Sequence, residues 1–130
     1  MTVNKLVKVA HEGAMNKGFH DKKVEMGTLL ALIHSEVSEA LEAHRSGKMM
    51  SEEHVGTLQH FIDDPVDEIE STGGIDWFEN NVKETFEMEL ADIVIRVADL
   101  CGLYGIDLES CIIAKIRYNS TRAYKHGKEY

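Results

Sequence analysis

The chain has 130 residues, of which 43% are hydrophobic, and it carries a formal net charge of −9 at pH 7. This length favours one domain with a modest core, and the negative charge argues against nucleic-acid binding by bulk electrostatics. No apolar run approaches the roughly 20 residues of a membrane span, and the N-terminal residues MTVNKLVK do not resemble a signal peptide. Cys101 and Cys111 lack CxxC spacing, so we expect reduced core thiols in a cytoplasmic protein.

A single proline and few β-branched runs indicate an all-α chain. Apolar spacing and end signals predict four or five helices. They run from Val3 to near Gly18, from about Val24 to Arg45 with Gly47 as its C-cap glycine, from the N-cap Ser51 through Ile62, from Trp77 to about Leu103, and, after the N-cap Asp107, from Leu108 to about Tyr124. The acidic stretch Asp63 to Asp76 holds the only proline and a Gly-Gly pair. We therefore expect a small helix bundle with a mobile loop or insertion around residues 48–76.

The predicted helix that ends at Arg45 carries acidic residues on its apolar face. At about 100° per residue, Glu36 falls inside the apolar arc and Glu39 falls at its edge, whereas Glu42 points to solvent. An unpaired buried carboxylate is costly and needs a cation, hydrogen-bond donors or a proton. A second pair, Glu89 and Asp92, lies beside the apolar stripe of the next long helix.

Two facing helices that each offer a carboxylate pair are typical of a metal site in a bundle. Hard carboxylate oxygens favour magnesium or manganese. A di-iron bundle would need Glu-x-x-His on two helices, and no glutamate here has histidine three places later. The competing interpretation of the four carboxylates is a solvated acidic stripe.

The C-terminal segment is basic in an otherwise acidic chain. Residues 115–130 hold five lysine and arginine residues against one glutamate, a net charge of +4 against −13 for the rest. Lys115, Asn119 and Arg122 share one face of the predicted last helix. This distribution suits an anionic ligand held through a divalent metal, although a solvated face is the simpler alternative. The dipeptide His20-Asp21 resembles a hydrolase signature that requires further His and Asp partners.

Three segments together resemble the MazG-like, all-α nucleoside triphosphate pyrophosphohydrolase superfamily, in particular its short phage and bacterial members and the related dimeric dUTPases. The segments are IHSEVSEALEAHR, ELADIVIRVADL and KIRYNSTRAYKHGKEY. The resemblance covers roughly residues 19–47 and 84–128, and residues 48–83 match none of its motifs. It implies a single domain over residues 1–130 with the four- to five-helix bundle of that superfamily.

The resemblance also implies magnesium-dependent hydrolysis of a nucleoside triphosphate, deoxy or non-canonical, to the monophosphate and pyrophosphate. Glu36, Glu39, Glu89 and Asp92 would be the metal-binding and catalytic carboxylates, with Glu39 our candidate for the general base. Lys115, Asn119 and Arg122 would contact phosphate or sugar, and Tyr118 would stack or hydrogen-bond.

The partners expected are the nucleotide and a second copy of the chain, with no nucleic acid and no membrane. The resemblance implies a homodimer or homotetramer. Val94, Ile95 and Ala98 widen the apolar face of the predicted fourth helix beyond one core, which fits self-association. The alternative function is non-catalytic: a module that binds a nucleotide without cleaving it, or a helical interaction module.

Overall fold

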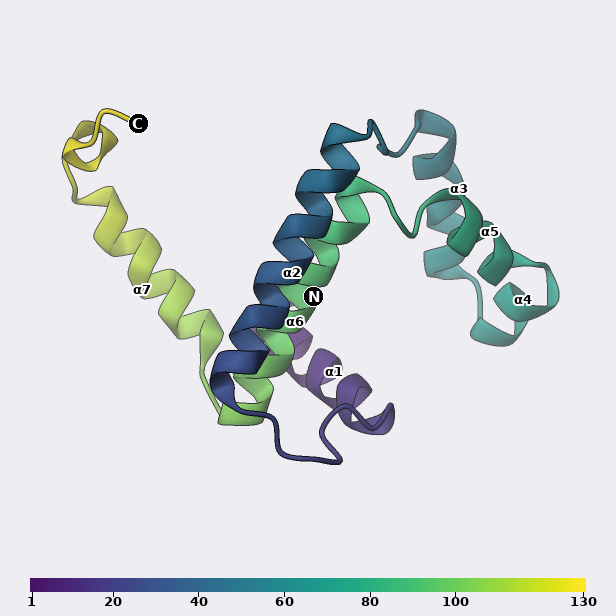
Figure 1. The fold of residues 1–130 in the computed structure, drawn as a ribbon, viewed down its shortest axis with the longest axis horizontal. Coiled ribbons are helices and arrows are strands. Elements are labelled where there is room, and N and C mark those ends of the chain that lie inside the picture. Colours follow the sequence, from purple (N-terminus) through teal and green to yellow (C-terminus); the bar gives the residue numbers. More distant parts are fainter. The chain divides into compact units, whose positions relative to one another are not determined.

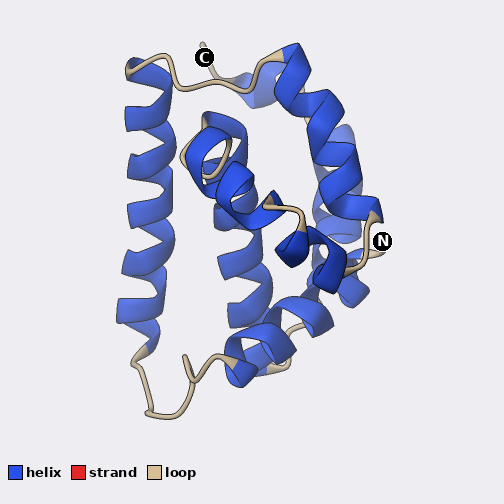
Figure 2. Ribbon diagram, turned by 90° about the vertical axis from the view of Figure 1, so that its right-hand side faces the viewer, coloured by secondary structure: helices blue, strands red, loops and turns tan.

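The computed structural model describes residues 1–130 and contains seven α-helices, one short 3-10 helix and no strand (Figure 2). The prediction of an all-α chain is confirmed. None of the helices combines the length and the apolar character needed to cross a bilayer. The chain divides into two units, Glu25–Val94 and Met1–Val24 with Ile95–Tyr130. Each unit is described by itself below, and the expectation of a single domain stays a prediction.

The unit Glu25–Val94 pairs one long helix with the beginning of another. Helix α2 spans Met26–Arg45, and α6 spans Phe86–Tyr104 and belongs to this unit up to Val94 (Figure 1). The backbone N–H of Phe86 donates to the carbonyl of Lys48 at 2.8 Å, so the start of α6 meets the segment that follows α2. The ring of His44, in the last turn of α2, lies 5.7 Å from the ring of Phe86, the first residue of α6. The two helices are therefore antiparallel, with the middle of α2 beside the first turns of α6.

Sequence signals for the ends of α2 and of the next helix are confirmed. Gly47, which follows α2, has φ +70°, the left-handed conformation that glycine adopts most readily. Helix α3, Glu52–Asp63, begins at a capping box. The Ser51 side chain accepts from the His54 N–H at 3.1 Å, and the Ser51 N–H donates to Nδ1 of the His54 ring.

Residues 63–76, which we expected to form a loop, contain further helix. Helix α4 spans Val66–Ser71, and α5 spans Gly74–Asn81. The acidic residues that suggested a loop include Asp67 and Glu68 in the first turn of α4 and Asp76 in the first turn of α5, where the helix dipole favours them. The stacked rings of Phe61 and Phe78, 4.8 Å apart, hold α3 against α5.

The prediction of one helix from Trp77 to Leu103 is wrong, because a turn separates α5 from α6. Val82 is the C-cap of α5 and is only 1% exposed. The Thr85 hydroxyl donates to the Val82 carbonyl at 2.7 Å and satisfies a group that a continuous helix would have used. Val82 is buried although it lies in a turn, so it fits the apolar pattern of a continuous helix. The pattern therefore could not reveal the break.

The other unit consists of α1, the second half of α6 and α7. Helix α1 spans Val3–Asn16, and α7 spans Leu108–Ser120, followed by the 3-10 helix Tyr124–Gly127. Asp107 caps α7 as predicted, and its bonds to Ser110 lower the pKa of the Asp107 carboxyl. The backbone N–H of Asn4 donates to Glu109 at 3.0 Å, which joins the beginnings of α1 and α7.

The last helix was expected to reach Tyr124, but α7 ends at Ser120. Ala123 has φ −59° and ψ 161°, an extended conformation, so the backbone leaves the right-handed helix before Tyr124. Of the two cysteines, Cys101 is buried as expected, and burial raises the pKa of its thiol. Cys111 is exposed, contrary to the expectation that both lie in the core.

Helices α1 and α6 meet closely at Gly102. A Cβ atom built on Gly102 would overlap the Cβ and ring of His11, whereas one on Gly13 would meet nothing. Only glycine therefore lets the His11 side chain lie against this part of α6.

We expect Gly102→Ala to lower the free energy of unfolding. Overpacking costs about 1–3 kcal/mol. The gain in helix propensity, about 1 kcal/mol, is too small to offset a clash with the Cβ and ring of His11. Gly13→Ala, also inside a helix but in open space, is the matched control and should be neutral or stabilising. Urea titrations of both variants and the wild type test this. Equal effects of the two substitutions would contradict the packing of His11 on Gly102.

Candidate metal centre

Three carboxylates predicted as metal ligands lie together in the unit Glu25–Val94. Glu36 of α2 and Glu89 and Asp92 of α6 each place a side-chain oxygen within 4.8 Å of the others. Glu36 is 6% exposed and Glu89 is 5% exposed, whereas Asp92 is exposed. The cluster thus has two buried members on facing helices and one member open to solvent.

The local sequence explains how the two helices approach at this point. Glu36, Ala40 and Ala43 follow one another on a single face of α2, and all three are buried. Small side chains at Ala40 and Ala43 leave room for a neighbouring helix to pack closely. On α6, the three-residue spacing of Glu89 and Asp92 puts both carboxylates on adjacent positions of one side.

Electrostatics in the cluster disfavour ionisation of Glu89. Burial raises the pKa of Glu89, and the negative charges of Glu39, Asp92, Glu84 and Glu36 raise it further, in that order of importance. A divalent cation among these oxygens would reverse the sign of the local potential. The donor set therefore fits a hard cation such as Mg²⁺ or Mn²⁺, since it consists of carboxylate oxygens alone.

Glu39, the fourth predicted ligand, stands apart from this group. Its side chain is exposed, and it is not among the three residues whose oxygens converge. Its charge nevertheless has the largest effect of any neighbouring carboxylate on the Glu89 pKa. The position at the edge of the apolar arc, predicted from the helical wheel, agrees with this placement beside the cluster.

The four residues predicted to bind substrate lie in the other unit, on and just after α7. The Lys115 ammonium lies 5.2 Å and the Arg122 guanidinium 5.8 Å from the centre of the Tyr118 ring, so both cations lie near this ring. The Tyr118 side chain remains 57% exposed. The side-chain oxygen of Asn119 is buried and makes no hydrogen bond, and Arg122 donates to the His126 carbonyl at 3.4 Å.

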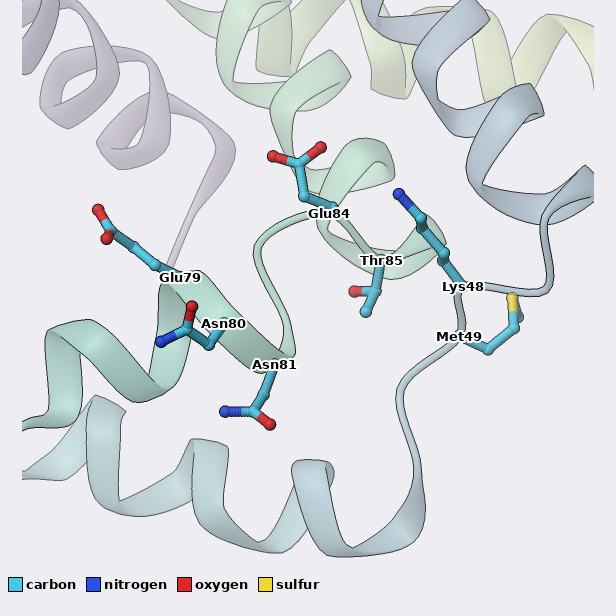
Figure 3. A pocket seen from close by; sticks show the side chains of 7 residues that line it. All are labelled: Lys48, Met49, Glu79, Asn80, Asn81, Glu84 and Thr85. Atoms are coloured by element: carbon cyan, nitrogen blue, oxygen red, sulfur yellow. The ribbon is translucent and has the colours of Figure 1, made fainter.

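A pocket that the sequence did not predict lies next to the start of α6. Its volume is about 330 Å³, and Figure 3 shows side chains from the segment after α2, from the last turn of α5 and from the α5–α6 turn around it. The lining residues are Lys48, Met49, Glu79, Asn80, Asn81, Glu84 and Thr85. Glu84 connects it to the carboxylates, because its charge also raises the pKa of Glu89. No sequence signal marked this pocket, since residues 48–83 match no motif and their turn was expected to be helix.

Comparison of the chain with protein-family models, with curated proteins and with solved structures gave no match. The resemblance to MazG-like pyrophosphohydrolases therefore rests on the three sequence segments quoted above and stays a prediction.

The raised pKa of Glu89 predicts how stability depends on pH in the absence of divalent metal. The folded chain holds the Glu89 proton more tightly than the unfolded chain. Ionisation of Glu89 therefore lowers the stability of the fold above its folded pKa, and this penalty is absent below its ordinary value of 4.5. We expect Glu89→Gln to be more stable than the wild type at neutral pH in chelator, with an advantage that shrinks as the pH falls.

Thermal melts in chelator across this pH range measure the difference. Glu70→Gln, at an exposed position of α4, is the control for loss of one negative charge. A Glu89→Gln variant less stable than the wild type at neutral pH would contradict the repulsion described here.

Proposed function

We propose that this chain is a nucleoside triphosphate pyrophosphohydrolase that uses Mg²⁺ or Mn²⁺ and releases the monophosphate and pyrophosphate. The observation that carries the proposal is the meeting of Glu36 and Glu89, two buried carboxylates from different helices, with Asp92. Buried carboxylates gathered at one point are costly in a structural core. The same arrangement is productive where a cation and a phosphate chain must be held together.

Each carboxylate has a part in this proposal that its position supports. Glu36, Glu89 and Asp92 would hold the cation, which when bound polarises a phosphate oxygen and lowers the pKa of a coordinated water. Glu39 is exposed and close enough for its charge to act on Glu89. It can therefore accept a proton from water at the edge of the cluster.

The cationic group on α7 supplies the chemistry for phosphate binding. Lys115 and Arg122 lie over the same exposed ring of Tyr118. Charge-assisted bonds from such cations neutralise phosphate oxygens, and an exposed tyrosine offers a stacking surface. The assignment of these residues to the substrate rests on this chemistry and on the resemblance.

Exposed apolar side chains support self-association as part of the proposal. Leu30, Val37 and Leu41 of α2 are about half exposed, and so are Ile113 and Ile116 of α7. Large apolar surfaces of this kind are typical of protein interfaces. They also favour the second candidate function, a helical interaction module without catalysis, and the activity assay below separates the two.

We expect the purified chain, incubated with Mg²⁺ and each canonical or modified nucleoside triphosphate in turn, to release monophosphate and pyrophosphate from at least one of them. Chromatography of the nucleotides and a pyrophosphate-specific assay identify the bond that is cut. Orthophosphate and diphosphate as first products would contradict the proposal, and no product from any triphosphate would favour the interaction module.

Glu36→Gln tests whether the carboxylate cluster performs the reaction. We expect kcat to fall by more than about tenfold, the lower limit for residues that only support a metal ligand, and stabilisation by Mg²⁺ to be lost. Glu42→Gln, on the exposed side of the same helix, should keep both. Retention of activity and of Mg²⁺ stabilisation in Glu36→Gln would make Glu36 a structural residue.

Lys115→Ala and Arg122→Ala should weaken triphosphate binding by about tenfold or more, because a charge-assisted contact contributes about 1.5–3 kcal/mol. Stabilisation by Mg²⁺ alone should be unchanged, since neither side chain is a metal ligand. Lys5→Ala, at an exposed position of α1, controls for the loss of one positive charge. Unchanged KM in both α7 variants would remove these residues from substrate binding.

A further inference from the structure

A second group of metal-binding side chains lies in the unit formed by Met1–Val24 and Ile95–Tyr130. His11 comes from α1, His20 from the turn after α1, and Asp99 from α6. Nδ1 of His11 lies 2.9 Å from Oδ1 of Asp99. Nε2 of His20 lies 2.8 Å from the same oxygen and 2.9 Å from Oδ2. All three side chains thus converge through atoms that bind metals.

The three side chains are largely shielded from solvent. Their exposed fractions are 21% for His11, 11% for His20 and 19% for Asp99. The two imidazole rings are 5.3 Å apart and tilted by 45°, so they do not stack face to face. Each ring instead directs a nitrogen at the Asp99 carboxylate.

The backbone around the cluster fixes both histidines. Gly102 of α6 gives His11 the space that any side chain there would fill. The turn that carries His20 is closed by backbone bonds from Gly18 to Met15, from Phe19 to Ala14 and from Asp21 to Gly18. Gly18 has φ +80°, which glycine adopts without strain. Ligands held in advance in this way lose little freedom when an ion binds.

We propose that His11, His20 and Asp99 bind Zn²⁺, with one coordination position left open. Two imidazole nitrogens and one carboxylate oxygen are a typical zinc donor set, and nitrogen ligands disfavour Mg²⁺. Tetrahedral zinc, with bonds of about 2.0–2.2 Å, needs ligand atoms roughly 3.3–3.5 Å apart. The contacts of 2.8 and 2.9 Å must therefore widen by about half an ångström, which small side-chain rotations supply.

A hydrogen-bonded clamp without metal is the simpler alternative for this group. In that case the Asp99 carboxylate accepts an N–H from each imidazole, and both hydrogen bonds would have to break before zinc could bind the two nitrogens. The two cases differ in what the ion does to α1. Bound zinc links α1 and the following turn to α6 within this unit, so it stabilises the fold by an amount that grows with the logarithm of its affinity.

The first test uses the wild-type chain after treatment with chelator, in millimolar Mg²⁺ to occupy the carboxylates of the other unit. Competition with a chromophoric chelator measures Zn²⁺ affinity, and Co²⁺ serves as a spectroscopic probe. We expect a single equivalent of Zn²⁺, a rise in melting temperature and the visible absorption bands of four-coordinate Co²⁺. The imidazole ¹⁵N resonances of His11 Nδ1 and His20 Nε2 should shift on addition of Zn²⁺. Unshifted resonances at both nitrogens would overturn the proposal without any variant.

Variants then separate this site from the carboxylate cluster. His20→Gln should lower Zn²⁺ affinity by at least about tenfold, whereas His34→Gln, an exposed histidine of α2, should not. Glu89→Gln should bind Zn²⁺ like the wild type. Zinc binding that survives in His20→Gln and disappears in Glu89→Gln would assign the ion to the carboxylates and overturn the proposal. Circular dichroism of each variant checks that the loss of affinity is not a loss of fold.

Discussion

The unit Glu25–Val94 depends on the antiparallel contact between α2 and the start of α6, and this contact encloses charge. Glu36 and Glu89 are almost fully buried where the helices meet. An apolar pair at these positions would pack the same helices without the cost of desolvating two carboxylates. Four neighbouring carboxylates raise the pKa of Glu89 in addition to burial. The sequence thus accepts a destabilising arrangement where α2 meets the start of α6, as functional sites commonly do.

The surrounding structure restrains the cluster from the end of the contact where α6 begins. The Phe86 N–H bonds to the Lys48 carbonyl, and the Met50 N–H bonds to Glu87 at 3.0 Å. These bonds fix the beginning of α6 against the segment after α2, so Glu89 and Asp92 face Glu36 in a defined register. Repulsion alone would drive the carboxylates apart. The fixed register of the two helices keeps the carboxylates from moving apart. The like charges are therefore held together as a preorganised site.

The sequence predicted those features that repeat along one helix and missed those that depend on turns and on tertiary contacts. The apolar arc of α2 predicted that Glu36 is buried and that Glu39 lies at its edge, and both placements are observed. The caps at Ser51 and Asp107 were likewise readable, because a cap is a local hydrogen bond. The break between α5 and α6 at Val82 was not predictable, because a buried apolar residue in a turn can continue the apolar spacing of a helix. The sequence pattern did not single out His11, because its position beside Asp99 depends on a tertiary contact with Gly102.

The two groups of candidate ligands differ in chemistry, and this difference bears on how each would be filled. Carboxylate oxygens in the unit Glu25–Val94 select hard cations, whereas imidazole nitrogens in the other unit select zinc over magnesium. Cellular magnesium is abundant and binds weakly, so a site for it suits an ion that arrives with a phosphate substrate. A site with nitrogen ligands suits an ion that binds tightly and stays. Under the two proposals, donor type alone would separate an ion that takes part in turnover from one that stabilises the fold of its unit.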